Sequence, residues 1–162
     1  SADARRLMLE IAVKYVPQLT VDDRELHREG PSFSVDTLLS LREQFVNNPL
    51  FLILGTDAFR NISSWSRWQQ ILQLAHIVVV QRPDETLDMH EELEVWYHQN
   101  LAQAEDRQLS SGKIWPLNVT PMAISATQIR DELSAGNPVN FLLPDSVIAV
   151  IEQLELYQSK KQ

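Results

Sequence analysis

The 162-residue chain contains no cysteine and only four glycines. Without cysteine there is no disulfide framework, no thiolate nucleophile and no cysteine metal cluster, so a reducing compartment is compatible with the sequence. The few glycines form neither a G-x-G-x-x-G fingerprint nor a Walker A loop, which excludes both of these phosphate-binding loops. No apolar run approaches the length that spans a bilayer, and the first residues show no signal-peptide pattern. We therefore expect a soluble, cytoplasmic protein with no membrane partner.

Basic residues are also in short supply. The chain has 14 Lys and Arg residues against 22 Asp and Glu residues, which gives a net charge of −8. A negative surface repels polyanions, so we expect no nucleic-acid partner, although a local basic site for a small anion is compatible with this charge. A hydrophobic fraction of 44% over this length suits one compact domain with a proper core. The composition leaves the oligomeric state open.

Strand and helix patterns alternate along the chain. The apolar runs at residues 50–54 and 77–80 are typical of strands buried on both faces of a parallel sheet, and a helical stretch between them indicates a βαβ crossover. Two further strands are expected at residues 19–22 and 113–117. Helices are expected before Pro17, after a Ser34 cap, and at residues 65–75, 88–104, 125–136 and 145–154. These patterns predict an α/β fold, a Rossmann-like parallel sheet with helices on both faces.

The segment I-S-A-T-Q-I-R at residues 124–130 has the pattern of a helix start. Ser125 is a good N-cap residue, Gln128 follows three residues later as in a capping box, and Gly136 supplies a C-terminal stop. The free N–H groups and the positive dipole end of such a helix form an anion site. Arg130 lies about one and a half turns into the helix, within reach of an anion held there. The alternative is that S-x-T before an apolar run is only a cap.

Ligands of open parallel sheets bind outside the carboxyl ends of the strands. The residues that follow the predicted strands there include Gly55 and Asp57, Arg82, and the segment 118–130. Together they supply a carboxylate for ribose hydroxyls and arginines with a helix end for phosphates, a mixture that suits a nucleotide. For two of these residues a structural role is the alternative to ligand binding. Asp57 could merely cap the next helix, and Arg82 could merely be an exposed residue of the turn before Pro83.

Aromatic and histidine side chains offer weaker signals. Trp68 is expected to pack in the core, whereas Trp65 lies nearer the ligand edge and could either pack or stack on a planar heterocycle. His90, Glu94 and His98 share a helical face at a spacing that metal ligands use. Their acidic neighbours indicate a solvated face instead, so we expect no metal ligand among them.

Several segments resemble, in their order and spacing, bacterial nicotinate-nucleotide adenylyltransferases of the nucleotidyltransferase superfamily. They lie at residues 30–38, 54–59, 64–68, 76–83 and 124–130, and the chain also ends like that family at residues 141–147 and 156–157. The resemblance implies that AMP is transferred from ATP to nicotinate mononucleotide, giving deamido-NAD and pyrophosphate in NAD biosynthesis. The family reaction is a direct in-line attack with Mg²⁺ bound mainly through the ATP phosphates.

The resemblance also implies roles for particular residues. ATP and nicotinate mononucleotide would be the partners, and Arg130 would be catalytic. The implied ATP-binding residues are Gly55, Asp57, Ser125, Thr127 and Arg130. The implied residues for nicotinate mononucleotide are Ser34, Thr37, Trp65, Ser66 and Arg82. No residue of the protein is implied as a metal ligand.

The sequence departs from the family pattern in three places. The family begins with a strand and a loop of the G-G-T-F-D-P-x-H-x-G-H kind, whose histidines polarise the ATP phosphates, and no residue here matches it. We therefore expect residues 1–162 to be the larger, C-terminal part of a single nucleotidyltransferase domain and to be inactive alone. Phe33 and Ser34 replace a common Tyr-Thr pair, and Ser66 replaces a common Tyr or His. The alternatives are a nucleotidyltransferase with another phosphorylated acceptor, or a non-catalytic nucleotide-binding remnant.

Overall fold

The computed structural model describes residues 1–81, 86–120 and 124–158. The chain divides into two compact units: unit 1 combines Ser1–His27 with Met122–Gln162, and unit 2 is Arg28–Pro121. Unit 2 contains the sheet, and the regular elements of unit 1 are helical. None of the helices in the described ranges has the length and apolarity that crossing a membrane requires. The prediction of one domain over residues 1–162 stays a prediction.

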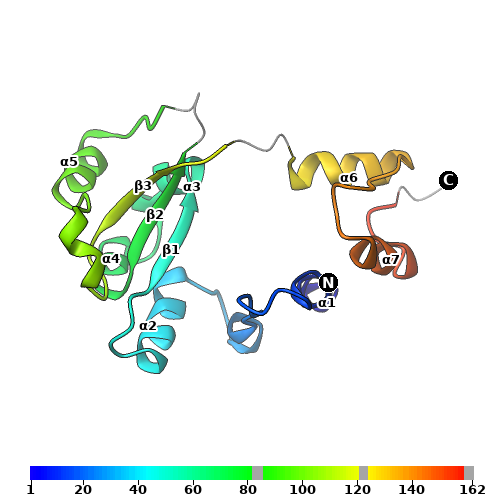
Figure 1. Cartoon of the computed structure of the whole chain (residues 1–162), viewed down its shortest axis with the longest axis horizontal. Coiled ribbons are helices and arrows are strands. Elements are labelled where there is room, and N and C mark those ends of the chain that lie inside the picture. The colour runs from blue at the N-terminus through cyan, green and yellow to red at the C-terminus, as the bar shows by residue number, and fades with distance from the viewer. Residues whose placement is uncertain (82–85, 121–123, 159–162) are drawn as a thin grey trace. The chain divides into compact units, whose positions relative to one another are not determined.

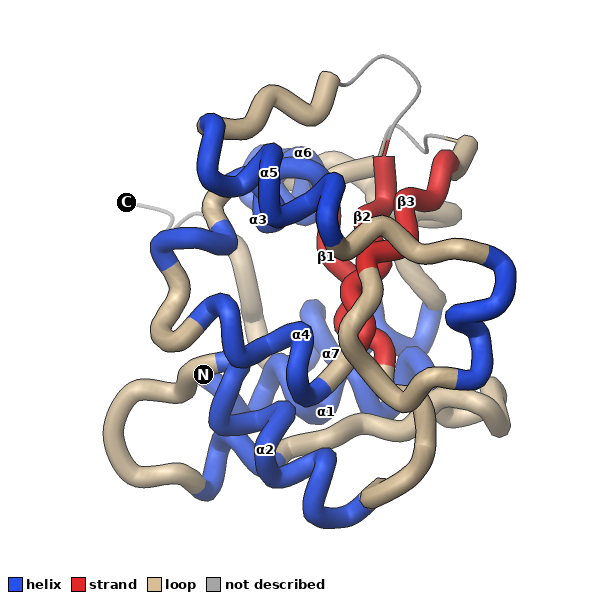
Figure 2. The backbone as a smooth tube through the Cα atoms, turned by 90° about the vertical axis from the view of Figure 1, so that its left-hand side faces the viewer, coloured by secondary structure: helices blue, strands red, loops and turns tan. Residues whose placement is uncertain are grey.

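The sheet of unit 2 has three parallel strands in the order β1-β2-β3 (Figures 1 and 2). They are β1 (Phe51–Gly55), β2 (His76–Gln81) and β3 (Ile114–Asn118). Phe51 pairs with His76, and Ile77 pairs with Ile114. Parallel neighbours need a crossover connection, and helical segments within residues 56–74 and 91–108 connect β1 to β2 and β2 to β3. The strands predicted at residues 50–54, 77–80 and 113–117 are confirmed, with each end shifted by one residue.

The remaining regular elements of unit 2 are helices and 3-10 turns. They are α2 (Ser34–Gln44), α3 (Thr56–Arg60), α4 (Ile71–Leu74) and α5 (Glu91–Gln99), with 3-10 turns η2 (Ile62–Ser64), η3 (Trp68–Gln70) and η4 (Ala104–Gln108). Phe33 is the N-cap of α2, so the prediction of a Ser34 cap is wrong by one residue. Gly55 caps α3, so Asp57 lies in the first turn and is not a cap. The helix predicted at 65–75 begins only at Trp68, because Arg67 has a left-handed backbone.

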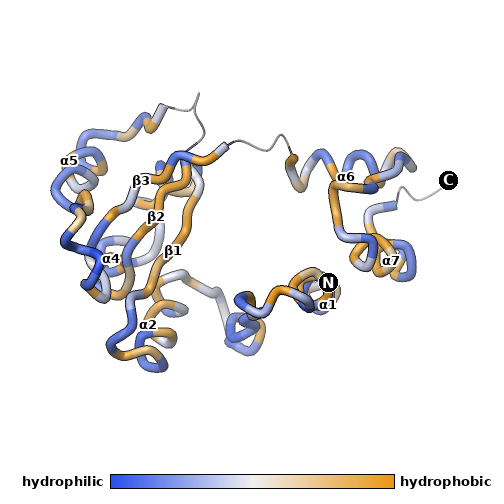
Figure 3. Tube along the Cα trace, in the orientation of Figure 1, coloured by the Kyte–Doolittle hydropathy of each residue, from blue (hydrophilic) through white to orange (hydrophobic). Residues whose placement is uncertain are grey.

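The core of unit 2 lies against one face of the sheet. The buried strand residues Leu54, Ile77, Val79 and Ile114 belong to one cluster with side chains of α2, α3, α4 and α5. Full burial of such a side chain contributes about 1.5–3 kcal/mol relative to exposure. Figure 3 shows β1 and β2 as largely hydrophobic.

Strand β1 is not buried on both faces as predicted. Alternate side chains of a strand point to opposite faces, and Phe51 and Ile53 on the second face are 48% and 67% exposed. Leu54, by contrast, is buried, and β1 pairs with β2. The continuous apolar run was a correct signal for the strand, although it did not predict how far each face is covered.

Unit 1 contains α1 (Ala2–Val13), the 3-10 turn η1 (Arg24–His27), α6 (Ala126–Ala135) and α7 (Asp145–Gln153). The Oγ of Ser1 accepts a hydrogen bond from the N–H of Ala4 at 3.2 Å, so α1 begins at a serine cap. Helix α1 packs against α7. An apolar groove of about 410 Å³ lies among α1, α6 and α7, and Arg130 is part of its lining. The predicted starts of the last two helices are confirmed, and the first helix lies before Pro17 as predicted.

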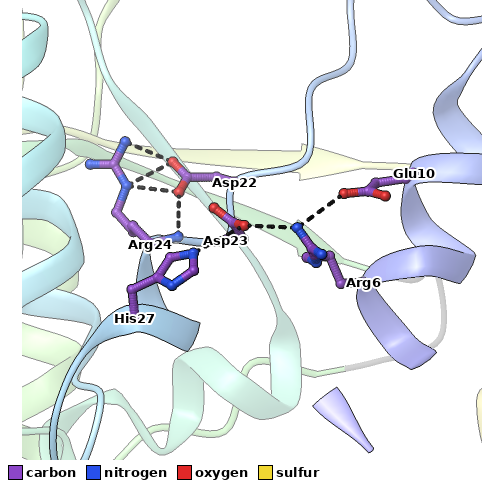
Figure 4. Close-up of polar contacts among 6 residues, drawn as sticks. All are labelled: Arg6, Glu10, Asp22, Asp23, Arg24 and His27. Atoms are coloured by element: carbon purple, nitrogen blue, oxygen red, sulfur yellow. Dashed lines mark hydrogen bonds and ion pairs between the residues drawn. The ribbon is translucent and has the colours of Figure 1, made fainter. Parts of the chain in front are cut away.

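The strand predicted at residues 19–22 is wrong. This stretch is irregular and leads into η1. The Asp22 carboxylate accepts the N–H of Arg24 at 3.1 Å and the Arg24 Nε at 2.8 Å, which closes a local turn (Figure 4). The hydrogen bond from the Arg24 side chain lowers the pKa of Asp22. Side-chain bonds within the turn therefore take the place of a strand ladder.

The same turn is tied to α1 by a second acidic residue. The Oδ2 of Asp23 lies 3.2 Å from Nη1 of Arg6 and 3.2 Å from Nε2 of His27 (Figure 4). Arg6 also pairs with Glu10 at 3.5 Å. The hydrogen bond with His27, supported by Arg6, lowers the pKa of Asp23.

Candidate active site

The carboxyl end of β1 runs directly into α3. Gly55 has an ordinary extended backbone, with φ −74° and ψ 164°, and a Cβ added there would meet no atom within 4 Å. Neither backbone conformation nor packing therefore requires glycine at this position, and the missing side chain leaves the backbone open to a ligand. The buried Thr56 donates its hydroxyl to the carbonyl of Val80 at 3.3 Å, which joins the ends of β1 and β2.

Asp57 presents a carboxylate at this end of the sheet. Its side chain is 89% exposed, and its nearest cation, Nη1 of Arg60, lies 3.7 Å away, beyond hydrogen-bond distance. The carboxylate oxygens therefore keep lone pairs for hydroxyl donors such as those of ribose. Arg60 itself donates to the carbonyl of Thr86.

The residues predicted to bind nicotinate mononucleotide begin with Ser34 and Thr37 in the first turn of α2. The N–H of Thr37 bonds to the carbonyl of Phe33 at 3.2 Å. Nη1 of Arg28 donates to Oγ1 of Thr37 at 3.2 Å, which places a guanidinium beside this turn. Sequence reasoning missed Arg28, and its only signal was a cation in the turn-rich stretch that precedes the segment.

Trp65 and Ser66 lie in the turn between η2 and η3, and both are half-buried. Trp65 packs partly against the core, so the sequence alternatives of packing and stacking both remain available to it. Trp68 packs against the core and meets Trp96 edge to face at 4.8 Å, which confirms its predicted place. Between them Arg67 forms an ion pair with Asp36 of α2. Sequence reasoning missed this pair, because nothing local links residues so far apart.

Helix α6 begins at its predicted N-cap, Ser125. The Oγ of Ser125 accepts the N–H of Gln128 at 3.1 Å, and Gly136 closes the helix with a left-handed backbone at φ 77°. Nη2 of Arg130 bonds to Oγ1 of Thr127 at 3.3 Å. The side chains of Ser125, Thr127 and Arg130 are all exposed. Two hydroxyls and a guanidinium therefore stand beside the free N–H groups of a helix N-terminus, an arrangement suited to phosphate oxygens.

The predicted site residues fall into two groups, one in each unit. Ser125, Thr127 and Arg130 gather on α6 in unit 1, while the other described site residues belong to unit 2. Unit 2 holds Gly55 and Asp57 at the end of β1, and it links the Trp65–Ser66 turn to the start of α2. Arg82 lies outside the described residues.

No group of three or more His, Asp or Glu side chains is placed to hold a metal ion within residues 1–81, 86–120 and 124–158. His90 serves other contacts: its Nδ1 accepts the N–H of Leu93 at 3.4 Å as the cap of α5, and its Nε2 lies 2.9 Å from Oγ of Ser63.

Comparison with known proteins shows the class of protein to which the chain belongs. A family model described as cytidylyltransferase-like matches residues 1–132, which together with the parallel sheet and the α6 start makes the chain a nucleotidyltransferase. A curated relative from Pseudomonas putida (strain GB-1), named "Probable nicotinate-nucleotide adenylyltransferase", is 43% identical over 98% of this chain and 74% of its own length. A relative of the same name from Pseudomonas aeruginosa (strain UCBPP-PA14) is 42% identical over 98% and 75%. The chain belongs to the nicotinate-nucleotide adenylyltransferase family.

Solved structures agree with the fold. Plasmodium falciparum nicotinic acid mononucleotide adenylyltransferase complexed with APC is similar with a TM-score of 0.66 and 18% identity, over 96% of this chain and 75% of that one. The same enzyme complexed with NaAD has the same score and identity over 73% of its chain. At this identity the likeness concerns the fold, and it confirms the predicted α/β nucleotidyltransferase architecture.

Proposed function

We propose that this chain acts in the transfer of AMP from ATP to nicotinate mononucleotide, which forms deamido-NAD and pyrophosphate in NAD biosynthesis. The observation that carries this proposal is the start of α6, where exposed hydroxyls and Arg130 meet free backbone N–H groups in a chain of this family. In the proposed reaction a 5′-phosphate oxygen of the mononucleotide attacks the α-phosphorus of ATP. The bond from that phosphorus to the β-phosphate oxygen breaks, and pyrophosphate leaves.

The residues proposed to bind ATP are Ser125, Thr127 and Arg130 on α6 of unit 1, and Gly55 and Asp57 at the end of β1 in unit 2. The Ser125 hydroxyl accepts the Gln128 N–H and still has its own O–H to donate to a phosphate. Thr127 and Arg130 add a second hydroxyl and a charge that offsets the negative charge on the phosphates. Gly55 admits the nucleotide close to the backbone, and Asp57 accepts from the ribose hydroxyls. Such chemistry needs positioning and charge stabilisation, and no covalent intermediate.

The acceptor half uses the residues around α2 and the tryptophan turn. Trp65 is proposed to stack on the nicotinate ring, and backbone groups near Ser66 and residues 32–34 to read its carboxylate. Ser34 and Thr37, in the first turn of α2, are also proposed to bind the mononucleotide, and Arg82 is proposed to lie beside it. A backbone contact at residue 66 explains how serine could replace the larger Tyr or His that is common there.

A divalent metal ion assists phosphoryl and nucleotidyl transfer by neutralising phosphate charge. We propose Mg²⁺ for this role, bound mainly through the ATP phosphates, because Mg²⁺ commonly keeps several waters and uses substrate phosphates instead of an all-protein cage. The protein residues then orient the phosphates that carry the ion. A cytoplasmic location is part of the proposal, since ATP is supplied there.

An adenylyl-transfer assay on the full-length product of the gene, with ATP, Mg²⁺ and nicotinate mononucleotide, tests the proposal. We expect deamido-NAD, and we expect Arg130→Ala to lower kcat/KM by about 10²–10³-fold because it removes charge stabilisation. Arg107→Ala is the matched control, since Arg107 is an exposed arginine of η4 in unit 2. Residues 1–162 alone should be inactive, because nothing in them matches the H-x-G-H segment. If no deamido-NAD forms under any condition, the proposal is refuted.

The acceptor is tested separately, because the I-S-x-T-x-I-R segment does not fix it and the matching family model is named for another nucleotide. Nicotinate mononucleotide, nicotinamide mononucleotide and phosphopantetheine compete in one assay. We expect nicotinate mononucleotide to be adenylylated in preference to the other two acceptors. Preferential use of phosphopantetheine would assign the chain to another branch of the nucleotidyltransferases.

A further inference from the structure

Arg67 has a backbone conformation that L-residues other than glycine rarely adopt. Its φ is 52° and its ψ is 38°, in the left-handed region. It separates η2 from η3, so the chain changes direction between Trp65 and Trp68. Trp68 turns into the core against Trp96, while Trp65 precedes the bend as the cap of η2. A disfavoured conformation persists only where surrounding contacts hold it, and it tends to occur at ligand clamps.

The contact that holds Arg67 comes from α2. Its Nη2 forms an ion pair with Oδ1 of Asp36, which lies in the first turn of that helix. The N–H of Asp36 bonds to the carbonyl of Phe33 at 3.0 Å. One directional pair therefore connects the Trp65–Ser66 turn to the first turn of α2, where Ser34 and Thr37 lie.

This pair is poorly suited to stabilising the fold as a whole. The Arg67 and Asp36 side chains are 47% and 32% exposed, and ion pairs in such surroundings contribute little to unfolding free energy because solvent screens them. The pair does fix geometry, because it sets the separation of two segments that are distant in sequence. Both of these segments carry proposed contacts to the pyridine nucleotide and none to ATP.

We propose that the Asp36–Arg67 pair is a positioning device for the acceptor: it holds the Trp65–Ser66 turn and the start of α2 at the separation that a pyridine mononucleotide needs. Neither side chain is assigned a contact with the reacting atoms. The inference deepens the proposed function and rests on it, since it assigns Trp65, Ser66, Ser34 and Thr37 to the acceptor. It predicts that breaking the pair impairs use of the acceptor and spares use of ATP.

Steady-state kinetics of the full-length protein provide the test. Asp36→Asn and Arg67→Gln should each raise the KM for nicotinate mononucleotide about tenfold, with the KM for ATP within about twofold of the wild type. The combined variant should be no worse than either single variant, because both remove the same interaction. The exchange of charges in Asp36→Arg with Arg67→Asp should restore the acceptor KM to within about threefold, since aspartate tolerates a left-handed backbone.

Two further variants separate the effect of the ion pair from the effects of the left-handed backbone and of breaking any exposed pair. Arg67→Asn keeps a residue that tolerates the left-handed conformation but removes the charge, and we expect it to behave like Arg67→Gln. Glu10→Gln breaks the Arg6–Glu10 pair in unit 1, whose side chains are 42% and 47% exposed, and it should leave both KM values unchanged. Thermal unfolding of every variant confirms that each one folds.

Each outcome bears on one of the two claims. An active wild type whose acceptor KM stays unchanged in folded Asp36→Asn and Arg67→Gln overturns the positioning role, and so does an equal rise in both KM values. A wild type that forms no deamido-NAD refutes the proposed function instead. In that case calorimetric binding of nicotinate mononucleotide to the same variants tests the pair alone: about tenfold weaker binding supports it, and unchanged binding overturns it.

Discussion

The two ends of the three-stranded sheet in unit 2 are built differently. At the amino end, the Arg42 guanidinium donates to the carbonyls of Asn48 at 2.8 Å, Leu74 at 3.0 Å and Ser110 at 2.9 Å. These carbonyls lie in the segments that lead into β1, β2 and β3 respectively. Arg42 also bonds to the carbonyl of Phe45 just beyond its own helix. One charged side chain therefore joins the entrances of all three strands.

A buried histidine strengthens the same end. His76, the first residue of β2, is fully buried, and its ring stacks on Phe51 at 4.8 Å. Its Nδ1 accepts the N–H of Lys113 at 3.2 Å, and its Nε2 lies 2.8 Å from the carbonyl of Leu109. A neutral imidazole with its proton on Nε2 satisfies both contacts. The segment before β3 is thereby fixed to β2.

The carboxyl end of the same strands keeps its groups available. Gly55 has open space where a Cβ would stand, and the Asp57 side chain is 89% exposed. Thr56 joins this end to β2 through the Val80 carbonyl, so the frame is ordered while the polar groups beyond it stay accessible. The difference shows that side-chain bonds stabilise the sheet at one end, which allows the other end to present exposed groups to a ligand.

The largest effect on stability is expected at Arg42, at the amino end of the sheet. Arg42→Met keeps much of the apolar stem but removes the donors of several backbone carbonyls, so we expect the free energy of unfolding to fall by about 3 kcal/mol. Arg42→Lys should recover only part of this loss, because an ammonium group is compact and lacks the planar fork of donors. Urea unfolding measures both variants, with Arg107→Met as the control. Equal stability of Arg42→Met and wild type would remove the basis for the comparison.

His76 is expected to give the next largest effect. His76→Phe keeps a buried ring at this position but leaves the Lys113 N–H and the Leu109 carbonyl without this partner, which should cost about 2 kcal/mol of unfolding free energy. The exposed His98 provides the control variant His98→Phe, which should change stability by no more than about 0.5 kcal/mol. The KM for ATP of folded His76→Phe should match the wild type. A raised KM would show that the two ends are not independent.

Sequence patterns predicted the parts of the fold that depend on local chemistry. The apolar runs gave the strands that became β1 and β2, and Ser125 with Gly136 gave both ends of α6. The strand expected at residues 19–22 failed, because a strand needs a neighbour while Asp22 found a local partner in its own turn. The roles of Arg42 and His76 could not be predicted, since their partners lie up to 68 residues away in the chain.

The candidate site divides in the same way. Ser125, Thr127 and Arg130 lie within one short motif, and the structure places them together at the start of one helix, as the motif predicts. The ion pair between Asp36 and Arg67 depends on tertiary folding and on the left-handed backbone of Arg67, and no periodic pattern in the sequence predicts either of them. Local motifs therefore predicted the residues at the start of α6. The ion pair that joins the Trp65–Ser66 turn to the start of α2 is visible only in the structure.

At the carboxyl end, Gly55→Ala should weaken ATP use with little effect on folding. Because a Cβ there meets no protein atom, the free energy of unfolding should stay within about 0.5 kcal/mol of the wild type. A methyl group in the path of the nucleotide should raise the KM for ATP about tenfold, which corresponds to about 1.4 kcal/mol. Gly136→Ala is the opposite control: its φ of 77° disfavours alanine, so stability should fall by about 1 kcal/mol. A destabilised Gly55→Ala with normal KM would contradict the assignment.

The smallest expected effect lies near the amino end, at Asp106. Its Oδ2 accepts the N–H of Gln103 at 2.8 Å and lies 3.2 Å from Nζ of Lys113. The Gln103 hydrogen bond first, and then Lys113, lower the pKa of Asp106 from its ordinary value of 3.8. A lowered folded-state pKa stabilises the protein above the unfolded value, and this contribution is lost as pH falls through the folded value.

Wild type should therefore be slightly more stable than Asp106→Asn near neutral pH, and the gap should close as the pH falls below about 4. Urea unfolding over a pH series measures the gap, and Glu105→Gln, which removes the neighbouring exposed carboxylate, serves as the control. A gap that widened in acid would reverse the sign of the linkage. The KM for ATP should not follow this gap at any pH where both proteins fold, because Asp106 acts on the entrance to β3 and the nucleotide is proposed to bind beyond the exit of β1.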